Sequence, residues 1–476
     1  MTIAMPEENS ARGALAPRLG LVFILLVTCL VTAMSLVRTS EGLSQGYQYS
    51  RPDLSHPAVS LNLGYALAYC GQYSNSAGIV DPAELATLQN HERFTQGRQV
   101  DCSSTQPSFA AENGFSLIVA GGLWAGYDTP FKLGVFLTVL KYVLIAIAGA
   151  MALPVFGGWA ALSLTAATLG WAYWDEAYFY ASRLFLDFHA LEPYVWLVAV
   201  MFCIWTFHSA LSEKIGWRHW TIVVVASLSM LFLRLLRSSD FYIQEVALII
   251  IALCAAWFLK RDRRKLLVAV TSILIVVAAP MALGAAHANW LEHRACAAIG
   301  GDPATCARVL VNVEHPIWHP IVLGLAVPPS PISEKFGFEW ASDSETLKPA
   351  QFINPAVDKL YTPEFSKALK DFYVYIWTNL THETIATYLA KFGVLYSIGW
   401  PVMIFGMAGV IMGLWFGSLP TLFFSLLFVG KALESTLIYP PYWSLYHQSA
   451  GVLAIGVVVA SLVAFCDRRM WKSRKV

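Results

Sequence analysis

The stretch that decides the fold is residues 241–287, FYIQEVALIIIALCAAWFLKRDRRKLLVAVTSILIVVAAPMALGAAH. Two apolar runs flank the short basic connection KRDRRK at residues 260–265. A helix of about 20 apolar residues crosses the hydrocarbon core of a bilayer, and short basic connections stay on the cytoplasmic side. The stretch therefore predicts two membrane-spanning helices joined by a cytoplasmic turn.

The composition of the whole chain agrees with a membrane protein. Of its 476 residues, 57% are hydrophobic and 13% are charged, whereas soluble domains carry about 25% charged residues. The net charge of +1 and the absence of a basic stripe exclude a nucleic-acid partner. We therefore predict an all-α polytopic membrane protein in contact with membrane lipids.

Apolar runs long enough to span a bilayer recur along the chain and predict about ten transmembrane helices. The first run follows Arg12 and Arg18, as in a signal peptide, but we expect an uncleaved helix because no clear small-residue cleavage site follows. The predicted spans are Leu19–Val37, Phe131–Leu153, Gly157–Tyr173, Tyr194–Leu211, Trp220–Leu236, Phe241–Leu259, Leu266–His287, Val394–Trp415, Leu419–Ile438 and Ser449–Phe465.

Basic residues orient these spans. They gather in the N-terminal arm, beside Lys214, at residues 260–265 and in the C-terminal tail after Phe465. Ten spans place all four on the cytoplasmic side. The predicted organisation is a cytoplasmic arm (1–18), a transmembrane module (19–287) with a large outer loop (38–130), an extracytoplasmic region (288–393), and C-terminal spans with a basic tail (394–476). We expect the inner (plasma) membrane of a bacterium.

Cysteine usage supports the same orientation. Four of the eight cysteines lie within or at the end of predicted spans, and the other four lie two in each outer loop. Disulfides persist in oxidising compartments, so we expect bonds outside the cytoplasm. Proximity in sequence favours Cys70–Cys102 and Cys296–Cys306, although spacing alone does not fix connectivity.

Two segments of the outer loops have helical character. Residues 113–127 (NGFSLIVAGGLWAGY) are apolar but too short to span, which favours an interfacial or re-entrant segment. Residues 362–391 carry a stripe with helical spacing. Its members are Phe365, Leu369, Phe372, Ile376 and Trp377.

Acidic residues near the predicted outer surface are candidates for chemistry, because charge at membrane depth is costly. Glu41 lies four residues beyond the first span and is either a general base or a solvated loop acid. The connection between the third and fourth spans is crowded with titratable groups. These are Asp175, Glu176, Arg183, Asp187, His189 and Glu192.

Basic residues at the same predicted depth require compensation. Arg234 and Arg237 lie at the outer end of the fifth span, and Asp240, an acid from the connection between the third and fourth spans, or an anionic ligand would balance them. Arginine binds phosphate well because its fork donates two parallel hydrogen bonds. Lys431 in the ninth span is a further phosphate candidate, with the alternative that it pairs with Glu434.

The second outer loop adds His315, His319 and Asp343 as candidates. The two histidines are four residues apart, as zinc ligands on one helix face would be, but Pro316 disfavours helix at His315. Because no third ligand follows at a recognised spacing, we expect histidines that line a site or pack the loop. The ATP-binding and zinc-protease motifs are absent from the sequence.

This plan resembles the GT-C membrane glycosyltransferases, which use polyprenyl-phosphate sugars. Glu41 resembles their first acid by position, and Asp187 in SRLFLDFHALEP resembles their second, with Asp175 and Glu176 as rivals. The chain departs from the family in having a single acid where an acidic pair is common.

The resemblance implies transfer of a sugar from a lipid-linked donor to a glycan or glycolipid acceptor of the cell envelope. Glu41 and Asp187 would be catalytic, and Arg234, Arg237, Lys431 and His189 would bind the donor. No cofactor is required, and a divalent metal is optional. The alternatives are a transporter or flippase for an anionic lipid, which would use the same basic groups, and a non-catalytic envelope assembly protein.

Overall fold

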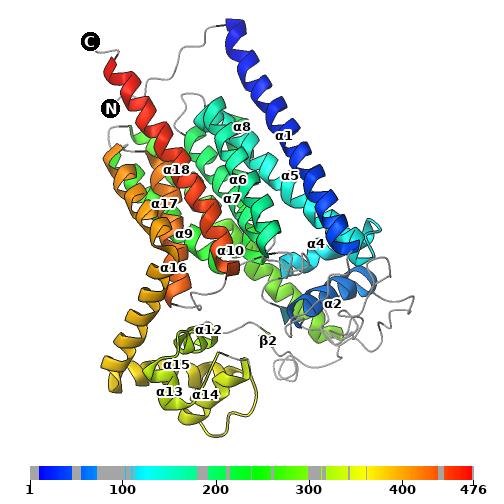
Figure 1. The fold of residues 1–476 in the computed structure, drawn as a ribbon, viewed down its shortest axis with the longest axis vertical. Helices are drawn as coiled ribbons and strands as arrows, with labels where there is room; N and C mark the ends of the chain where they lie inside the picture. The colour runs from blue at the N-terminus through cyan, green and yellow to red at the C-terminus, as the bar shows by residue number, and fades with distance from the viewer. Residues whose placement is uncertain are drawn as a thin grey trace.

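The computed structural model is almost entirely helical, with long helices side by side and a small helical subdomain at one end (Figure 1). It describes residues 10–44, 55–71, 102, 109–110, 113–179, 191–210, 215–236, 238–258, 262–298, 312–313, 318–340, 343–360, 362–416, 418–437 and 444–473.

Ten helices cover the ten predicted spans. They are α1 (Ser10–Ser44), α5 (Pro130–Phe156), α6 (Gly158–Phe179), α7 (Glu192–Ala210), α8 (Trp217–Leu236), α9 (Ser238–Phe258), α10 (Arg263–Ala298), α16 (Thr381–Phe416), α17 (Leu419–Leu437) and α18 (Ser444–Ser473).

Six segments within the described residues are long and apolar enough to cross a membrane. They are Arg18–Arg38, Phe131–Phe156, Glu192–Ala210, Trp217–Leu236, Arg263–Trp290 and Ser449–Cys466. Large apolar side chains on α1 face outward, with Leu26 64% and Leu30 62% exposed, as a lipid-facing helix requires. The chain is therefore an all-α membrane protein by length and composition of its helices, and the number of ten spans stays a prediction.

The ends of the helices differ from the predicted span boundaries. α1 continues through Glu41 to Ser44, and α10 continues beyond His287 to Ala298. Hydropathy detects only the apolar part of a helix, whereas the backbone continues as long as its hydrogen bonds are satisfied. By contrast, α5 ends where Gly157 adopts a φ of 82° and its N–H bonds to the carbonyl of Leu153, a backbone conformation that suits glycine.

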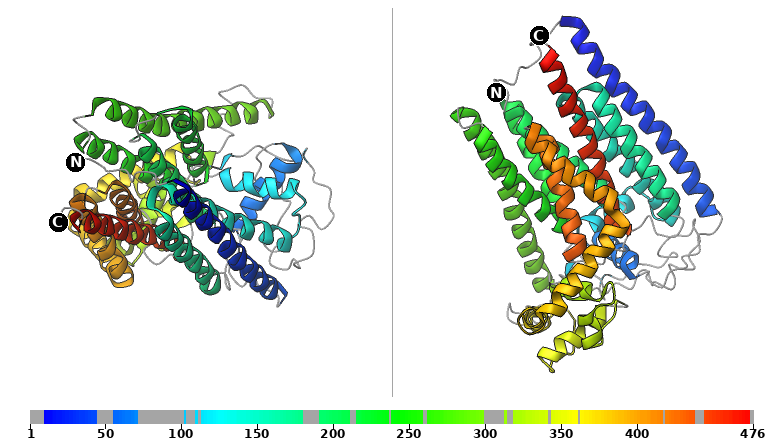
Figure 2. Two further views of the ribbon diagram at one scale, coloured as in Figure 1. Left: turned by 90° about the horizontal axis from the view of Figure 1, so that it is seen from above. Right: turned by 60° about the vertical axis from the view of Figure 1, so that its left-hand side comes forward.

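The start of α1 and the end of α18 lie at one end of the bundle, and the subdomain lies at the other (Figures 1 and 2). We call the latter the subdomain end. This arrangement agrees with the expectation that both termini share one side. The helices α7, α9, α17 and α18 are packed together within the bundle.

Two shorter helices, α2 (Ser55–Cys70) and α4 (Asn113–Trp124), pack on each other across the subdomain end (Figure 1). α4 has 12 residues, about 18 Å at 1.5 Å per residue, which is too short to span a membrane. Nε1 of Trp124 donates a hydrogen bond to the carbonyl of Ala68 at 3.0 Å. A short helix therefore occupies the segment for which the sequence predicted an interfacial or re-entrant structure.

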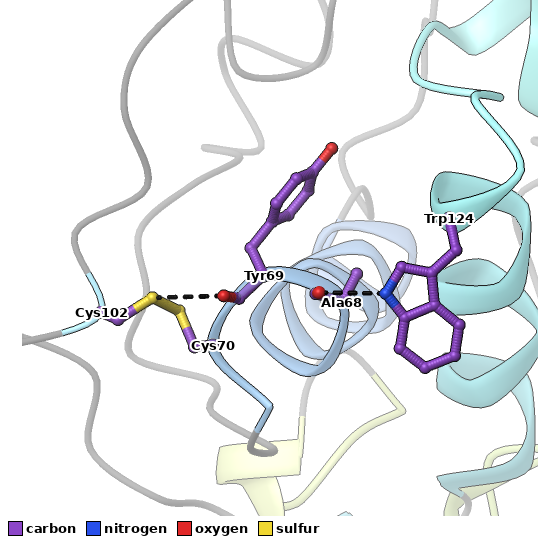
Figure 3. The surroundings of a disulfide bond; sticks show 5 residues. All are labelled: Ala68, Tyr69, Cys70, Cys102 and Trp124. Atoms are coloured by element: carbon purple, nitrogen blue, oxygen red, sulfur yellow. Dashed lines mark hydrogen bonds between the residues drawn. A yellow bond between two sulfur atoms is a disulfide. The ribbon is translucent and has the colours of Figure 1, made fainter.

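A disulfide joins Cys70, at the end of α2, to Cys102 (Figure 3). This confirms the first of the two predicted pairs. For the second pair, Cys306 lies outside the described residues. A short parallel pairing of β1 (Phe109–Ala110) with β2 (Asn312–Val313) connects the two predicted outer loops.

The subdomain contains α12 (Trp318–Leu323), α13 (Pro331–Phe336), α14 (Leu347–Ile353) and α15 (Pro363–Asn379) around its own apolar core. Thr362 caps α15, because its side chain accepts a hydrogen bond from the N–H of Phe365. The predicted stripe is buried from Phe365 to Ile376, whereas Trp377 is 37% exposed. The periodicity in the sequence thus identified the buried face of α15.

Candidate functional site

The polar centre of the bundle is a group of five side chains that we call the Lys431 cluster. Its members come from four helices: Glu192 begins α7, Asp240 lies in the first turn of α9, Lys431 and Glu434 lie near the end of α17, and Ser449 lies near the start of α18. Residues separated by up to 257 positions in the sequence meet here.

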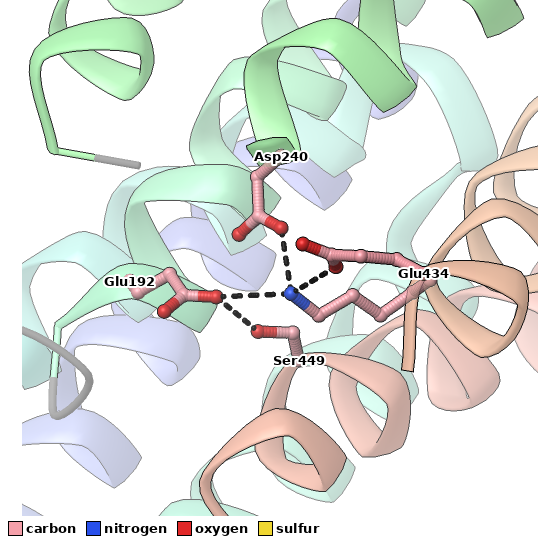
Figure 4. Close-up of polar contacts among 5 residues, drawn as sticks. Glu192, Asp240, Glu434 and Ser449 are labelled. Carbon is pink, nitrogen blue, oxygen red and sulfur yellow. Dashed lines mark hydrogen bonds and ion pairs between the residues drawn. The ribbon is translucent and has the colours of Figure 1, made fainter. Parts of the chain in front are cut away.

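The ammonium of Lys431 stands at the centre of the cluster (Figure 4). Its Nζ donates to Oδ1 of Asp240 at 2.7 Å and to Oε1 of Glu192 at 3.4 Å. Oε2 of Glu434 lies 2.9 Å from the same nitrogen. The lysine thereby connects α17 to both α7 and α9.

Ser449 and Trp196 complete the surroundings. The hydroxyl of Ser449 donates to Oε1 of Glu192 at 3.0 Å, which connects α18 to α7. Nζ of Lys431 also lies 5.6 Å from the centre of the Trp196 ring, within the range of a cation–π contact. The cluster is therefore built from both ionic and aromatic contacts.

The cluster is removed from water. The side chains of Lys431 and Asp240 are 0% exposed, and those of Glu192 and Glu434 are 1% and 3% exposed. Charges so deeply buried are costly unless they are paired and hydrogen-bonded. At this depth, three carboxyl groups and one ammonium cannot all be ionised without an excess of buried negative charge.

The guanidinium of Arg234 is hydrogen-bonded to backbone carbonyls and not to the acidic side chain or anionic ligand expected from the sequence. Its Nη1 donates to the carbonyls of Pro280 and Met281 in α10 at 3.1 and 2.8 Å. A Cβ at Gly284 would stand 2.8 Å from the guanidinium, so the glycine leaves room for it. Asp240, a candidate partner from sequence, is instead bonded to Lys431.

The lysine predicted to bind phosphate is thus already surrounded by acids, as in the alternative in which it pairs with Glu434. Sequence reasoning singled out Glu192 and Asp240 for other pairings and did not single out Ser449 or Trp196. Glu192 and Asp240 share one feature that the sequence shows: each lies in the first turn of a helix that follows a predicted outer connection.

The structure places only part of the remaining candidates. The backbone of Glu41 lies near the end of α1, and that of Asp343 begins the short 3-10 helix η4 (Asp343–Thr346). The backbones of Asp175 and Glu176, the rivals of Asp187, lie near the end of α6. Four further candidates are outside the described part of the chain, namely Asp187, His189, Arg237 and His315. The sequence further predicts that Glu41, the Asp187 segment and Arg237 meet at one outward-facing cavity, and this stays a prediction.

His319 belongs to the subdomain core. It is 2% exposed, and its ring centre lies 6.0 Å from that of Phe365. This position corresponds to the expected role of packing the loop. Within the described residues, no group of three or more histidine, cysteine or acidic side chains has a metal-binding arrangement. In the Lys431 cluster, an ammonium occupies the centre of the three carboxyl groups.

The geometry thus offers a buried charge cluster, an arginine held by carbonyls and an acid on the last turns of α1. Comparisons with protein-family models, with curated proteins and with solved structures find no match for this chain.

Proposed function

We propose that this chain is a membrane glycosyltransferase that transfers a sugar from a polyprenyl-phosphate donor to an acceptor outside the cytoplasm. One observation carries the proposal. The α1 helix extends through Glu41 at the subdomain end, where α2 and α4 lie at one side of the bundle. An acid on a rigid helix is better placed for catalysis than one on a loop.

In this proposal the acceptor hydroxyl attacks the anomeric carbon of the sugar while the bond from that carbon to the phosphate oxygen breaks. Glu41 takes the hydroxyl proton. Polyprenyl phosphate leaves as an anion, and Arg237 stabilises the charge that builds on it. Because Lys431 is held by three carboxyl groups, the proposal shifts the donor-binding role away from it and toward the arginines.

The test is transfer from a radiolabelled polyprenyl-phosphate sugar by the purified protein. Glu41→Gln keeps the size of the side chain but cannot take a proton, so turnover should fall about 10²–10⁴-fold, the usual contribution of acid–base catalysis. Glu84→Gln, in the same predicted outer loop, is the matched control and should keep its activity. Full activity in Glu41→Gln would remove Glu41 from the mechanism.

The Lys431 cluster favours a second candidate, a transporter or flippase for an anionic lipid. Ionisable groups buried among apolar helices mark ion and proton pathways in many membrane proteins. The two candidates differ in one product. A transferase releases free polyprenyl phosphate, whereas a flippase moves the intact lipid between leaflets of a vesicle.

A further inference from the structure

The Lys431 cluster has an imbalance of charge that its own residues do not remove. If all four titratable groups were ionised, the three carboxylates would leave two negative charges uncompensated by the single ammonium. An isolated buried charge costs far more than a paired one, and such a group normally neutralises by taking up or losing a proton. The imbalance therefore calls for additional positive charge.

The described contacts of the neighbouring helices supply little of it. On α9, the next polar side chain is Gln244, whose Nε2 donates to Sγ of Cys203 on α7. Ser449 is neutral. On α8, Arg234 is directed to the carbonyls of α10, and Glu245 on α9 would add negative charge. Arg237 is outside the described residues, and the experiment below tests its contribution.

The contacts within the cluster point to the missing species. Glu192 and Asp240 accept from one donor, the ammonium of Lys431, so acidic side chains from two helices are held close to the same nitrogen. An ionised carboxylate is a hydrogen-bond acceptor only, whereas a protonated carboxyl group can also donate. Oδ2 of Asp240 and Oε1 of Glu434 have no hydrogen-bond partner among the described residues, which leaves positions for a proton.

We propose that the Lys431 cluster is a proton-binding site in which Glu192, Asp240 and Glu434 together carry at least one exchangeable proton at neutral pH. The proton lies among four helices at the subdomain end of the bundle. Its loss would leave like charges facing one another between α17 and the pair α7 and α9, so proton binding favours the packed arrangement. This inference holds whether or not the chain transfers sugars.

Infrared spectroscopy of the purified protein at pH 7 tests the proposal directly. A protonated carboxyl group has a carbonyl-stretch band separate from that of a carboxylate, and the band shifts when deuterium replaces the proton. We expect such a band, with a shift in D₂O. Glu192→Gln, Asp240→Asn and Glu434→Gln are then compared, and at least one should weaken or shift the band.

Glu245→Gln is the matched control, because Glu245 is a partly buried acid on the same helix as Asp240, and its band should be unchanged. Absence of the band from the wild-type protein would overturn the proposal, and that is the result expected if Arg237 or a metal cation supplies the missing charge. A band that is unchanged in intensity and position in all three cluster variants, or that disappears in Glu245→Gln, would overturn it as well.

A second measurement leaves the cluster unchanged. Unfolding the protein at pH 7 exposes the cluster to water, where carboxyl groups ionise, so a buried carboxyl proton is released. Lys391, whose pKa burial lowers to about 7, takes up protons in the same transition, so the Lys391→Met protein is used. A pH indicator in weakly buffered detergent solution should record net proton release from this protein. Net uptake, or no change, would contradict the proposal.

Discussion

Two lysines among the described residues are completely buried, and their surroundings are opposite in charge. Lys431 in the bundle is 0% exposed and contacts three carboxyl groups. Lys391, near the subdomain, is also 0% exposed, but its Nζ has no hydrogen-bond partner among the described residues and lies 5.7 Å from the Tyr388 ring centre. The site around Lys431 has an excess of acidic groups, whereas the amine of Lys391 has no acidic partner among the described residues.

The comparison shows two solutions to the cost of burying charge. Around Lys431, ion pairs keep the ammonium charged, and the excess charge is the negative charge of the acidic side chains. At Lys391, three residues before the predicted span at Val394, burial lowers the pKa to about 7, so the amine is neutral in a large part of the molecules at neutral pH. Replacing the lysine by methionine should therefore change the stability of the protein in opposite directions at the two sites.

The largest effect is expected from Lys431→Met. This change keeps an unbranched side chain but leaves three buried carboxyl groups without their cation. Breaking a buried pair typically costs about 3–5 kcal/mol, so the detergent-solubilised protein should melt well below the wild type. An unchanged Tm would show that the pairing contributes little to stability.

Arg234→Met should have the next largest effect. The substitution removes two charge-assisted hydrogen bonds to α10 carbonyls, and both come from the same nitrogen. Because the two bonds share one donor atom and Arg234 is only partly buried, we expect a loss close to that of a single bond to a charged group, about 1.5–3 kcal/mol. The Tm should fall, but by less than in Lys431→Met. A larger fall in Arg234→Met would reverse the order that the comparison of buried cations predicts.

Lys391→Met should stabilise the protein at pH 7 and below. A buried group without a partner costs about 1–3 kcal/mol, and methionine removes that cost. The folded pKa is lowered to about 7 from 10.5, so the unfolded state binds more protons between these values and wild-type stability rises with pH across this window.

The difference in Tm between Lys391→Met and the wild type should therefore be largest below pH 7 and should shrink as the pH approaches 10. Thermal melts of both proteins over this range provide the measurement. A difference that does not depend on pH would mean that folding does not lower the pKa of Lys391, as would hold if the amine were paired or hydrated in the folded protein.

The smallest effect is expected from Lys348→Ala in the subdomain. Lys348 lies 2.6 Å from Glu345, and the lysine side chain is 50% exposed. This contact lowers the pKa of Glu345, yet exposed pairs contribute only about 0–1 kcal/mol. The Tm should stay close to that of the wild type. A loss as large as that of Arg234→Met would contradict the expectation that buried charged groups contribute more to stability than exposed ones.

The sequence predicted the helical class, the helix at each apolar run and the Cys70–Cys102 bond, because these depend on local composition and proximity. It identified the buried face of α15 from spacing alone. It did not predict that Lys431 meets Glu192, since the two residues are 239 positions apart and no local pattern records which helices pack together. The predicted spans in α1 and α10 lie within the apolar segments Arg18–Arg38 and Arg263–Trp290, and hydropathy could not show that polar residues continue both helices beyond these spans.

The disulfide between Cys70 and Cys102 also encloses the segment between them in a covalent ring. A single cut of the chain between these two residues leaves both fragments attached to each other, so the protein keeps its full mass until a reductant is added. A protease supplied only to the exterior of intact cells therefore gives a chemical record of sidedness. Fragments that separate on reduction alone would place this ring on the outer surface.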